Sequence, residues 1–199
     1  MNLPERIFFT GIPGSSWSRI ASTLSIAVPA INISDYSDNR KESLLPAHKG
    51  VYFGTGMEFP ADLSIENIDA PWAKNLYGTR IIKSHEWATK LDQINEMYPD
   101  DWIMLVHCAP VIKTINGWMN SGGFEIKYPN YSYYENKTKL IDLANRDNAA
   151  IIDFARKNKL KWNKFNKEWI EKNFNVEMGD DPVDYYGSPS ALVTLLKKY

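Results

Sequence analysis

The chain has 199 residues, of which 44% are hydrophobic and 24% are charged. This length is enough for one domain with a substantial core, and the composition is that of a globular protein. The formal net charge of −1 excludes a globally basic nucleic-acid binder, although a local basic groove would not show in the total. We therefore expect a single domain over residues 1–199, and nucleic acid is disfavoured as a partner.

The cysteine content and the apolar runs indicate the compartment. Cys108 is the only cysteine, which excludes an internal disulfide and favours a reducing environment. The amino-terminal MNLPERIFFTG holds too short an apolar run for a signal peptide, and no run reaches the length of a membrane span. We expect a cytoplasmic protein with no membrane partner.

The first half of the chain alternates strand and helix patterns. Residues 6–10 predict a buried strand, and 15–27 predict the helix after it. Short strands are expected at 30–33 and 79–83. Between them, 34–79 is rich in Asp, Asn, Gly and Pro, and a long irregular stretch of this kind is often functional.

The second half begins with a helical stripe formed by Trp87, Leu91, Ile94 and Tyr98. WIMLVH at 102–107 is apolar on both faces, as a central parallel strand would be. Pro110 is expected to open the next helix and Gly122-Gly123 to end it. Further helices are expected at 140–155, 163–173 and 189–198.

Strands separated by helices imply a parallel sheet with right-handed crossovers. We therefore expect a three-layer α/β/α fold with a mainly parallel central sheet. Ligands of such sheets bind outside the carboxyl ends of the strands. The three strand ends of interest are at Gly11, Lys83 and His107.

The segment GIPGSSWSRI at 11–20 resembles the phosphate-binding loop of P-loop proteins, GxxxxGK[ST]. Gly11 fits the first glycine and Ser18 the last hydroxyl, but Ser16 replaces the second glycine and Trp17 the lysine. Hydroxyls and the N–H groups of a helix N-terminus still suit an anion. Without the lysine, hydrolysis of ATP or GTP is disfavoured.

The same loop also resembles the phosphosulfate loop of sulfotransferases, which commonly ends Gly-Thr-Thr-Trp. Here residues 14–17 read Gly-Ser-Ser-Trp. In that family the loop holds the 5′-phosphosulfate of 3′-phosphoadenosine 5′-phosphosulfate. A basic residue usually precedes the glycine, where this chain has Ile12 and Pro13, and Arg19 is a candidate replacement. The alternative is a glycine turn before an N-capped helix, with no ligand.

IIKSHEW at 81–87 is similar to the Lys-Thr-His motif of sulfotransferases. Side chains two apart on a strand share a face, so Lys83 and His85 would emerge together if Ser84 is extended. In the family the lysine contacts the sulfuryl group and the histidine takes the proton of the acceptor. The alternative is a histidine bound to the backbone, with Lys83 in solvent.

The chemistry of sulfuryl transfer agrees with this pair. The transition state is loose and carries negative charge on oxygen, so positioning and positive charge supply most of the catalysis. A neutral imidazole suits a general base at neutral pH. Lys83 would supply the positive charge that the loop lacks, and no metal is required.

The third sulfotransferase element, a strand followed by Arg-x-Pro and a helical serine, matches less well. Cys108 stands at the arginine position and Asn116 at the serine position, whose family counterparts bind the 3′-phosphate. Asn116 can still donate a hydrogen bond. The basic run at 156–167, with Trp162 and Phe165, is either a replacement for the missing cation or a solvated helix end.

Two other sites are disfavoured by the sequence. His107 and Cys108 are adjacent on a strand, so they point apart and make a poor nucleophile–base pair. The three histidines show no metal-site spacing. Aromatic residues of 34–75 and 123–135 are candidates for the wall of an acceptor pocket: Tyr52, Phe53, Trp72, Tyr131 and Tyr133.

The resemblance thus implies a sulfotransferase acting on a small-molecule or glycan hydroxyl or amine. His85 and Lys83 would be catalytic. The residues assigned to the nucleotide donor are Gly11, Gly14, Ser15, Ser16, Trp17, Ser18, Arg19 and Asn116. The alternatives are a P-loop small-molecule kinase, or a non-catalytic member of the fold that binds a nucleotide or a protein.

Overall fold

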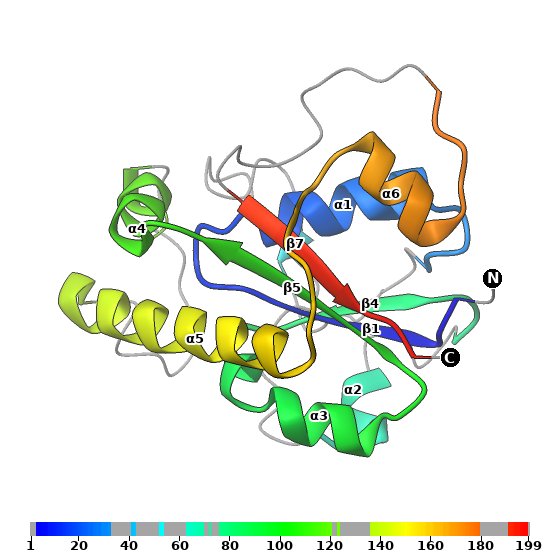
Figure 1. The fold of residues 1–199 in the computed structure, drawn as a ribbon, viewed down its shortest axis with the longest axis horizontal. Helices are drawn as coiled ribbons and strands as arrows, with labels where there is room; N and C mark the ends of the chain where they lie inside the picture. Colours follow the sequence, from blue (N-terminus) through cyan, green and yellow to red (C-terminus); the bar gives the residue numbers. More distant parts are fainter. Residues whose placement is uncertain are drawn as a thin grey trace.

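The computed structural model describes residues 3–32, 41–42, 52–53, 63–69, 72, 76–120, 123, 136–179 and 191–198, without the side chains of 18, 41–42 and 52–53. Within these residues the protein has an α/β fold (Figure 1). A five-stranded sheet crosses the centre, and helices lie on both of its faces.

The sheet is mixed. Its strands are β1 (Arg6–Thr10), β4 (Arg80–Lys83), β5 (Trp102–Cys108), β6 (Asn163–Lys164) and β7 (Ala191–Leu196), in the order β4-β1-β5-β7-β6. β1 pairs in parallel with β4 and β5. β7 pairs antiparallel with β5 and β6, so the expected mainly parallel sheet holds for only one half.

The helices form two layers around this sheet (Figure 1). α1 (Trp17–Ala27) and α6 (Lys167–Phe174) lie on one face, and α3 (Leu91–Met97) and α5 (Lys137–Lys157) lie on the other. α4 (Val111–Asn120) follows the carboxyl end of β5. The remaining elements are α2 (Ile65–Asp69), the 3₁₀ helix η3 (His85–Thr89), and a two-stranded sheet of β2 (Lys41–Glu42) and β3 (Tyr52–Phe53).

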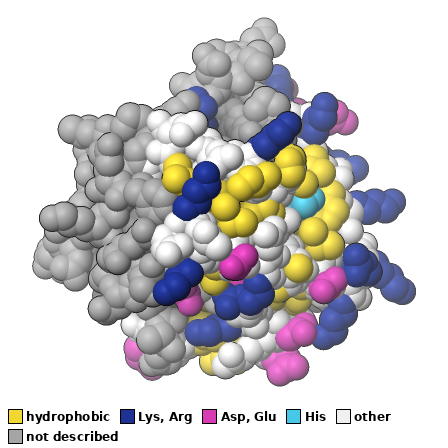
Figure 2. Space-filling view, turned by 90° about the vertical axis from the view of Figure 1, so that its left-hand side faces the viewer, with side chains coloured by type: hydrophobic (Ala, Val, Ile, Leu, Met, Phe, Trp, Pro, Cys, Tyr) yellow, Lys and Arg dark blue, Asp and Glu magenta, His cyan; other side chains and the backbone are white. Residues whose placement is uncertain are grey.

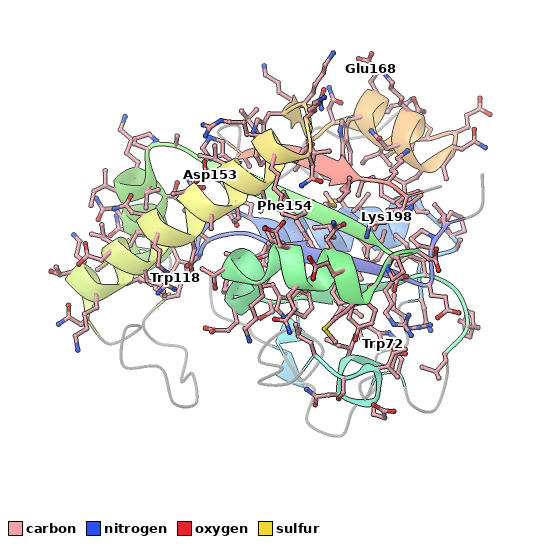
Figure 3. All side chains as sticks on the ribbon, turned by 60° about the horizontal axis from the view of Figure 1, so that its bottom comes forward. Trp72, Trp118, Asp153, Phe154, Glu168 and Lys198 are labelled. Atoms are coloured by element: carbon pink, nitrogen blue, oxygen red, sulfur yellow. The ribbon has the colours of Figure 1, made fainter. Side chains whose placement is uncertain are left out.

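The strand β1 divides the hydrophobic core into two parts. Ile7 and Phe9 pack with α1 and α6, whereas Phe8 packs with α3, η3 and α5. The alternation follows from the two-residue period of a strand. On α5, Phe154 is buried against the sheet and Asp153 points away from it (Figure 3).

The helix expected at 189–198 is wrong, because Ala191–Leu196 forms the strand β7. The leucines at 192, 195 and 196 stand at positions i, i+3 and i+4, the spacing of one face of a helix. Val193 and Thr194 are β-branched, and six residue pairs join β7 to β5. Pairing with the central strand therefore outweighs a weak local preference.

Several predicted helix starts are also corrected. α1 begins at Trp17 rather than at 15, since Ser16 has a left-handed φ of 62°. α6 begins at Lys167 rather than at 163, where the Asn166 side chain accepts the Trp169 N–H, and β6 occupies 163–164. Pro110 immediately precedes α4, which ends at Asn120, before the expected glycines.

The other expected elements are present with small changes. Of the strand expected at 30–33, the described residues 30–32 hold one parallel bridge, between Ile31 and Thr79. The expected stripe from Trp87 to Tyr98 is buried, but it spans η3 and α3. Where the structure is described, none of the helices combines the length and apolar character needed to cross a bilayer.

Candidate active site

The loop between β1 and α1 has two left-handed residues, Gly14 with φ 80° and Ser16 with φ 62°. The Ser15 N–H donates to the Ile12 carbonyl at 3.1 Å, which closes the turn. Ser16 makes no side-chain hydrogen bond to cap α1, and the first turn of α1 holds no acidic residue. The amide dipoles at this helix start are therefore suited to an anion.

The glycines of this loop are required by close packing. A Cβ on Gly14 would lie 2.7 Å from the Thr114 carbonyl oxygen and 2.9 Å from Trp118 Cβ, both on α4. A Cβ on Gly11 would collide with Val106 of β5. The loop is therefore held between α4 and β5, and its amides have a fixed direction.

His85 contacts this loop directly. Its Nδ1 hydrogen-bonds to the Gly11 carbonyl oxygen, and its ring stacks on Trp17 with centroids 3.8 Å apart and planes at 26°. Because the carbonyl can only accept, Nδ1 carries the proton and Nε2 is the basic nitrogen of the neutral ring. His85 is thus bound to a backbone group, as the alternative interpretation of the sequence expected. That group, however, is the Gly11 carbonyl of the loop.

Lys83 lies on the same side of the sheet as the contact between His85 and the loop. It pairs with Phe9, whose side chain faces α1, and Ser84 is extended with φ −154° and ψ 136°. The extended Ser84 therefore directs Lys83 and His85 to one side, as the sequence predicted. Both side chains are buried, at 3% and 9% exposure, so Lys83 does not lie in solvent.

Two hydroxyls near the loop lack hydrogen-bond partners among the residues that can be placed. They belong to Ser15, which is fully buried, and to Thr10, the last residue of β1. A buried hydroxyl without a partner loses about 1–3 kcal/mol of hydrogen bonding. The Ser15 hydroxyl lies against Gly11, since a Cβ on Gly11 would be 2.7 Å from the Ser15 Oγ.

The other predicted donor residues are placed less favourably. Arg19 is half-buried in the first turn of α1, and Asn116 is half-buried on α4. Trp17, at the P-loop lysine position, is buried under the His85 ring. The side chain of Ser18 lies outside the described residues.

Cys108 does not replace the 3′-phosphate arginine. It is 1% exposed in the core on the α1 side, and burial raises the pKa of its thiol to about 11, against a hydrogen bond with Thr114. His107 lies on the opposite side, where its Nδ1 is 3.1 Å from Asn148 Oδ1. The two residues point apart as expected, so they do not form a nucleophile–base pair.

The predicted acceptor wall is largely outside the described residues. This holds for Tyr131, Tyr133 and the side chains of Tyr52 and Phe53. Trp72 is 2% exposed within the core cluster of Phe8 and Trp87, so it is a core residue rather than a pocket wall. Within the parts of the chain that can be described, no three His, Cys, Asp or Glu side chains are grouped to hold a metal ion.

Sequence reasoning missed two buried polar residues of α5, Asp147 and Asn148. They occupy the same helical stripe as the core residues Ala144 and Ile151. A polar pair within an apolar stripe is a signal that sequence can give, because buried polar groups need specific partners. Asn148 has such partners in His107 and in the Cys108 carbonyl, to which its Nδ2 donates at 3.3 Å.

Asp147 gives a prediction for stability against pH. Burial raises its pKa from the ordinary 3.8 to about 6, against the opposing hydrogen bond from Arg146, and nearby Glu86 adds to the rise. The protonated carboxyl therefore stabilises the fold below pH 3.8, and this contribution is lost as the pH rises through about 6. Asp147→Asn is expected to increase the free energy of unfolding at about pH 8 by up to about 2–3 kcal/mol.

Urea unfolding of the wild type and of Asp147→Asn at about pH 8 and about pH 4 measures this difference. The gain should disappear at the lower pH, where the folded wild type is already protonated. Asp153→Asn on the exposed side of α5 is the control and should change stability by no more than about 0.5 kcal/mol at either pH. An equal gain at both pH values would contradict the raised pKa.

Comparisons with protein-family models, with curated proteins and with solved structures find no match for this chain.

Proposed function

We propose that this protein transfers a sulfuryl group from 3′-phosphoadenosine 5′-phosphosulfate to a hydroxyl or amine of a small molecule or glycan. The observation that carries the proposal is the position of His85. Its ring stacks on Trp17 and its Nδ1 binds the Gly11 carbonyl, so an imidazole lies against the loop between β1 and α1. Lys83 lies on the same side of the sheet and brings a buried cation to this end of β4.

The residues present fit the phosphosulfate end of the donor. The uncapped start of α1 offers N–H groups, and the buried Ser15 hydroxyl lacks a partner among the described residues. The residues fit the 3′-phosphate poorly, since Cys108 is a buried neutral thiol. Asn116, half-buried on α4, remains as a hydrogen-bond donor for that phosphate.

The roles of the two catalytic side chains follow from their chemistry. His85 Nε2 accepts the proton of the acceptor hydroxyl or amine, while the Nδ1 bond to Gly11 holds the ring in the required tautomer. The Lys83 ammonium stabilises negative charge that develops on oxygen during transfer. The bound donor supplies the sulfuryl group: its bond from sulfur to the 5′-phosphate oxygen breaks as the bond to the acceptor forms, and adenosine 3′,5′-bisphosphate leaves.

A P-loop kinase is less well supported. The residue at the position of the P-loop lysine is Trp17, which is 5% exposed and covered by His85. A tryptophan there brings no charge to the terminal phosphates of ATP. A nucleotide-binding protein without catalysis is the second candidate, favoured by the burial of both Lys83 and His85.

Calorimetric titration with adenosine 3′,5′-bisphosphate, and in parallel with ATP, tests the proposal. We expect the bisphosphate to bind and ATP not to bind. Lys83→Met keeps the side-chain volume and removes the charge, so it should weaken bisphosphate binding by about tenfold or more and abolish sulfuryl transfer. Lys172→Met, at an exposed position on α6, is the control and should change neither.

Each other outcome contradicts part of the proposal. Binding of the bisphosphate without transfer of sulfate to any acceptor would favour the non-catalytic protein. Binding of ATP in the presence of Mg²⁺ would favour the kinase. Failure of both nucleotides to bind would exclude a nucleotide donor.

A further inference from the structure

On the face of the sheet that α5 packs against, the side chains at the carboxyl end of β5 and on the neighbouring strands are only partly buried. His107 of β5 pairs with Leu192 of β7, and Leu192 pairs with Lys164 of β6. Directly paired residues on neighbouring strands project to the same face. The three side chains therefore lie in a row, and this face is opposite to the one that carries Lys83.

At this row of side chains, the helices no longer cover the sheet completely. Two residues further into the sheet, Leu105 and Thr194 are buried on this same face. Leu192 and His107 are only half-buried, and Lys164 is exposed. Ala109, Pro110 and Ile112 follow His107 in the chain where α4 begins, and all three are exposed, Ile112 at 44%.

We call this surface the His107 patch, made up of His107, Pro110, Ile112, Trp162, Lys164 and Leu192. Figure 2 shows a histidine within a hydrophobic area, with Lys and Arg side chains around it. The His107 ring lies 5.4 Å from that of Trp162, and Asn148 fixes its Nδ1. The centre of the patch is therefore held in place before any partner arrives.

The border of the patch is cationic. The run at 156–167 holds six basic residues and no acidic one, and three of the six, Arg156, Lys157 and Lys167, pair with acidic residues outside the run. Within it Lys159, Lys161 and Lys164 are exposed, and Lys113 on α4 is exposed next to Ile112. An apolar centre with a charged rim is the usual anatomy of a protein interface, and the sign of the rim selects an acidic partner.

We propose that the His107 patch docks an acidic polypeptide segment that carries aliphatic side chains. Its carboxylates would pair with the lysines of the rim, and its aliphatic groups would cover Ile112 and Leu192. A single-stranded nucleic acid fits less well, because it needs open aromatic faces for stacking. Here the rings of His107 and Trp162 contact each other at 56°, and both are half-buried, whereas Ile112 is 44% exposed.

Amide chemical shifts of the isotope-labelled protein, titrated with a short peptide of alternating glutamate and leucine, test this proposal. We expect salt-sensitive shifts at residues 107, 112, 164 and 192. Lys164→Glu, on an exposed edge strand, should weaken binding by about tenfold because attraction becomes repulsion. Lys172→Glu on α6 makes the same change of net charge and should leave the affinity unchanged.

Three parallel titrations distinguish the other occupants: a lysine–leucine peptide, oligothymidylate, and vesicles containing phosphatidylserine. Preference for the oligonucleotide or the vesicles would overturn the proposal in favour of nucleic acid or a membrane. Equal affinity for the glutamate–leucine peptide and the lysine–leucine peptide would overturn the proposed pairing of carboxylates with the lysines of the rim. Absence of shifts at the patch with the glutamate–leucine peptide would overturn it altogether. None of these outcomes depends on nucleotide binding at the loop.

Discussion

Replacing His85 with asparagine is expected to reduce sulfuryl transfer by about 10²–10⁴-fold while adenosine 3′,5′-bisphosphate still binds. The asparagine Nδ2 takes the position of His85 Nδ1 and can donate to the Gly11 carbonyl, so the loop keeps its contact. The amide has no basic nitrogen, so it cannot accept the proton of the acceptor hydroxyl or amine. The loss should therefore appear in kcat rather than in donor affinity.

The measurement is transfer of labelled sulfate to a panel of hydroxyl and amine acceptors, together with calorimetry on the same preparation. Asn148→Ala offers a comparison, since the hydrogen bonds that it removes go to His107, on the opposite side of the sheet from Lys83, and to the Cys108 carbonyl. It should lower stability and keep activity at a temperature where it remains folded. Transfer at the wild-type rate in His85→Asn would exclude His85 as the base, and loss of bisphosphate binding would make its role structural.

The strand ends were the part of the site that sequence could predict. β1 has the predicted bounds, since five buried residues precede a glycine turn and leave little choice of conformation. The alternation that places Lys83 and His85 on one side needs only an extended Ser84. Local rules of this kind transfer directly from sequence to structure.

The burial of these side chains could not be predicted in the same way. His85 is covered because Trp17, separated from it by a whole crossover, supplies a ring of matching size. Likewise, Ala191–Leu196 forms a strand only because β5 offers it an unpaired edge. Both outcomes depend on partners distant in sequence, and no window of local pattern contains them.

The amino ends of the strands carry a buried ion network that has no part in the proposed chemistry. Arg6 donates to Asp69 through Nε at 2.9 Å and Nη2 at 2.6 Å, and to Asp101 through Nη1 at 3.1 Å. Arg80 adds a second cation beside Asp69 at 3.2 Å. The Arg6 and Asp101 side chains are only 8% and 7% exposed, so water cannot replace either partner.

Arg6→Met is therefore expected to lower the free energy of unfolding by about 3–5 kcal/mol, since it leaves the Asp101 carboxylate buried without its cation. Arg156→Met, which breaks an exposed pair with Asp153, should cost less than about 1 kcal/mol. Urea unfolding of both variants and of the wild type gives these differences. A loss below about 1 kcal/mol in Arg6→Met would mean that Asp101 is solvated or protonated without Arg6.

The pH dependence separates lost charge pairing from lost packing. Burial already raises the pKa of Asp101 in the wild type, against the hydrogen bonds from Arg6. Without Arg6 that pKa rises further, so the variant regains stability as the pH falls and the carboxyl takes up a proton. The deficit of Arg6→Met relative to the wild type should thus shrink from neutral to acid pH. A deficit that stays constant with pH would assign the effect to packing against Tyr98, whose ring lies 5.8 Å from the guanidinium carbon.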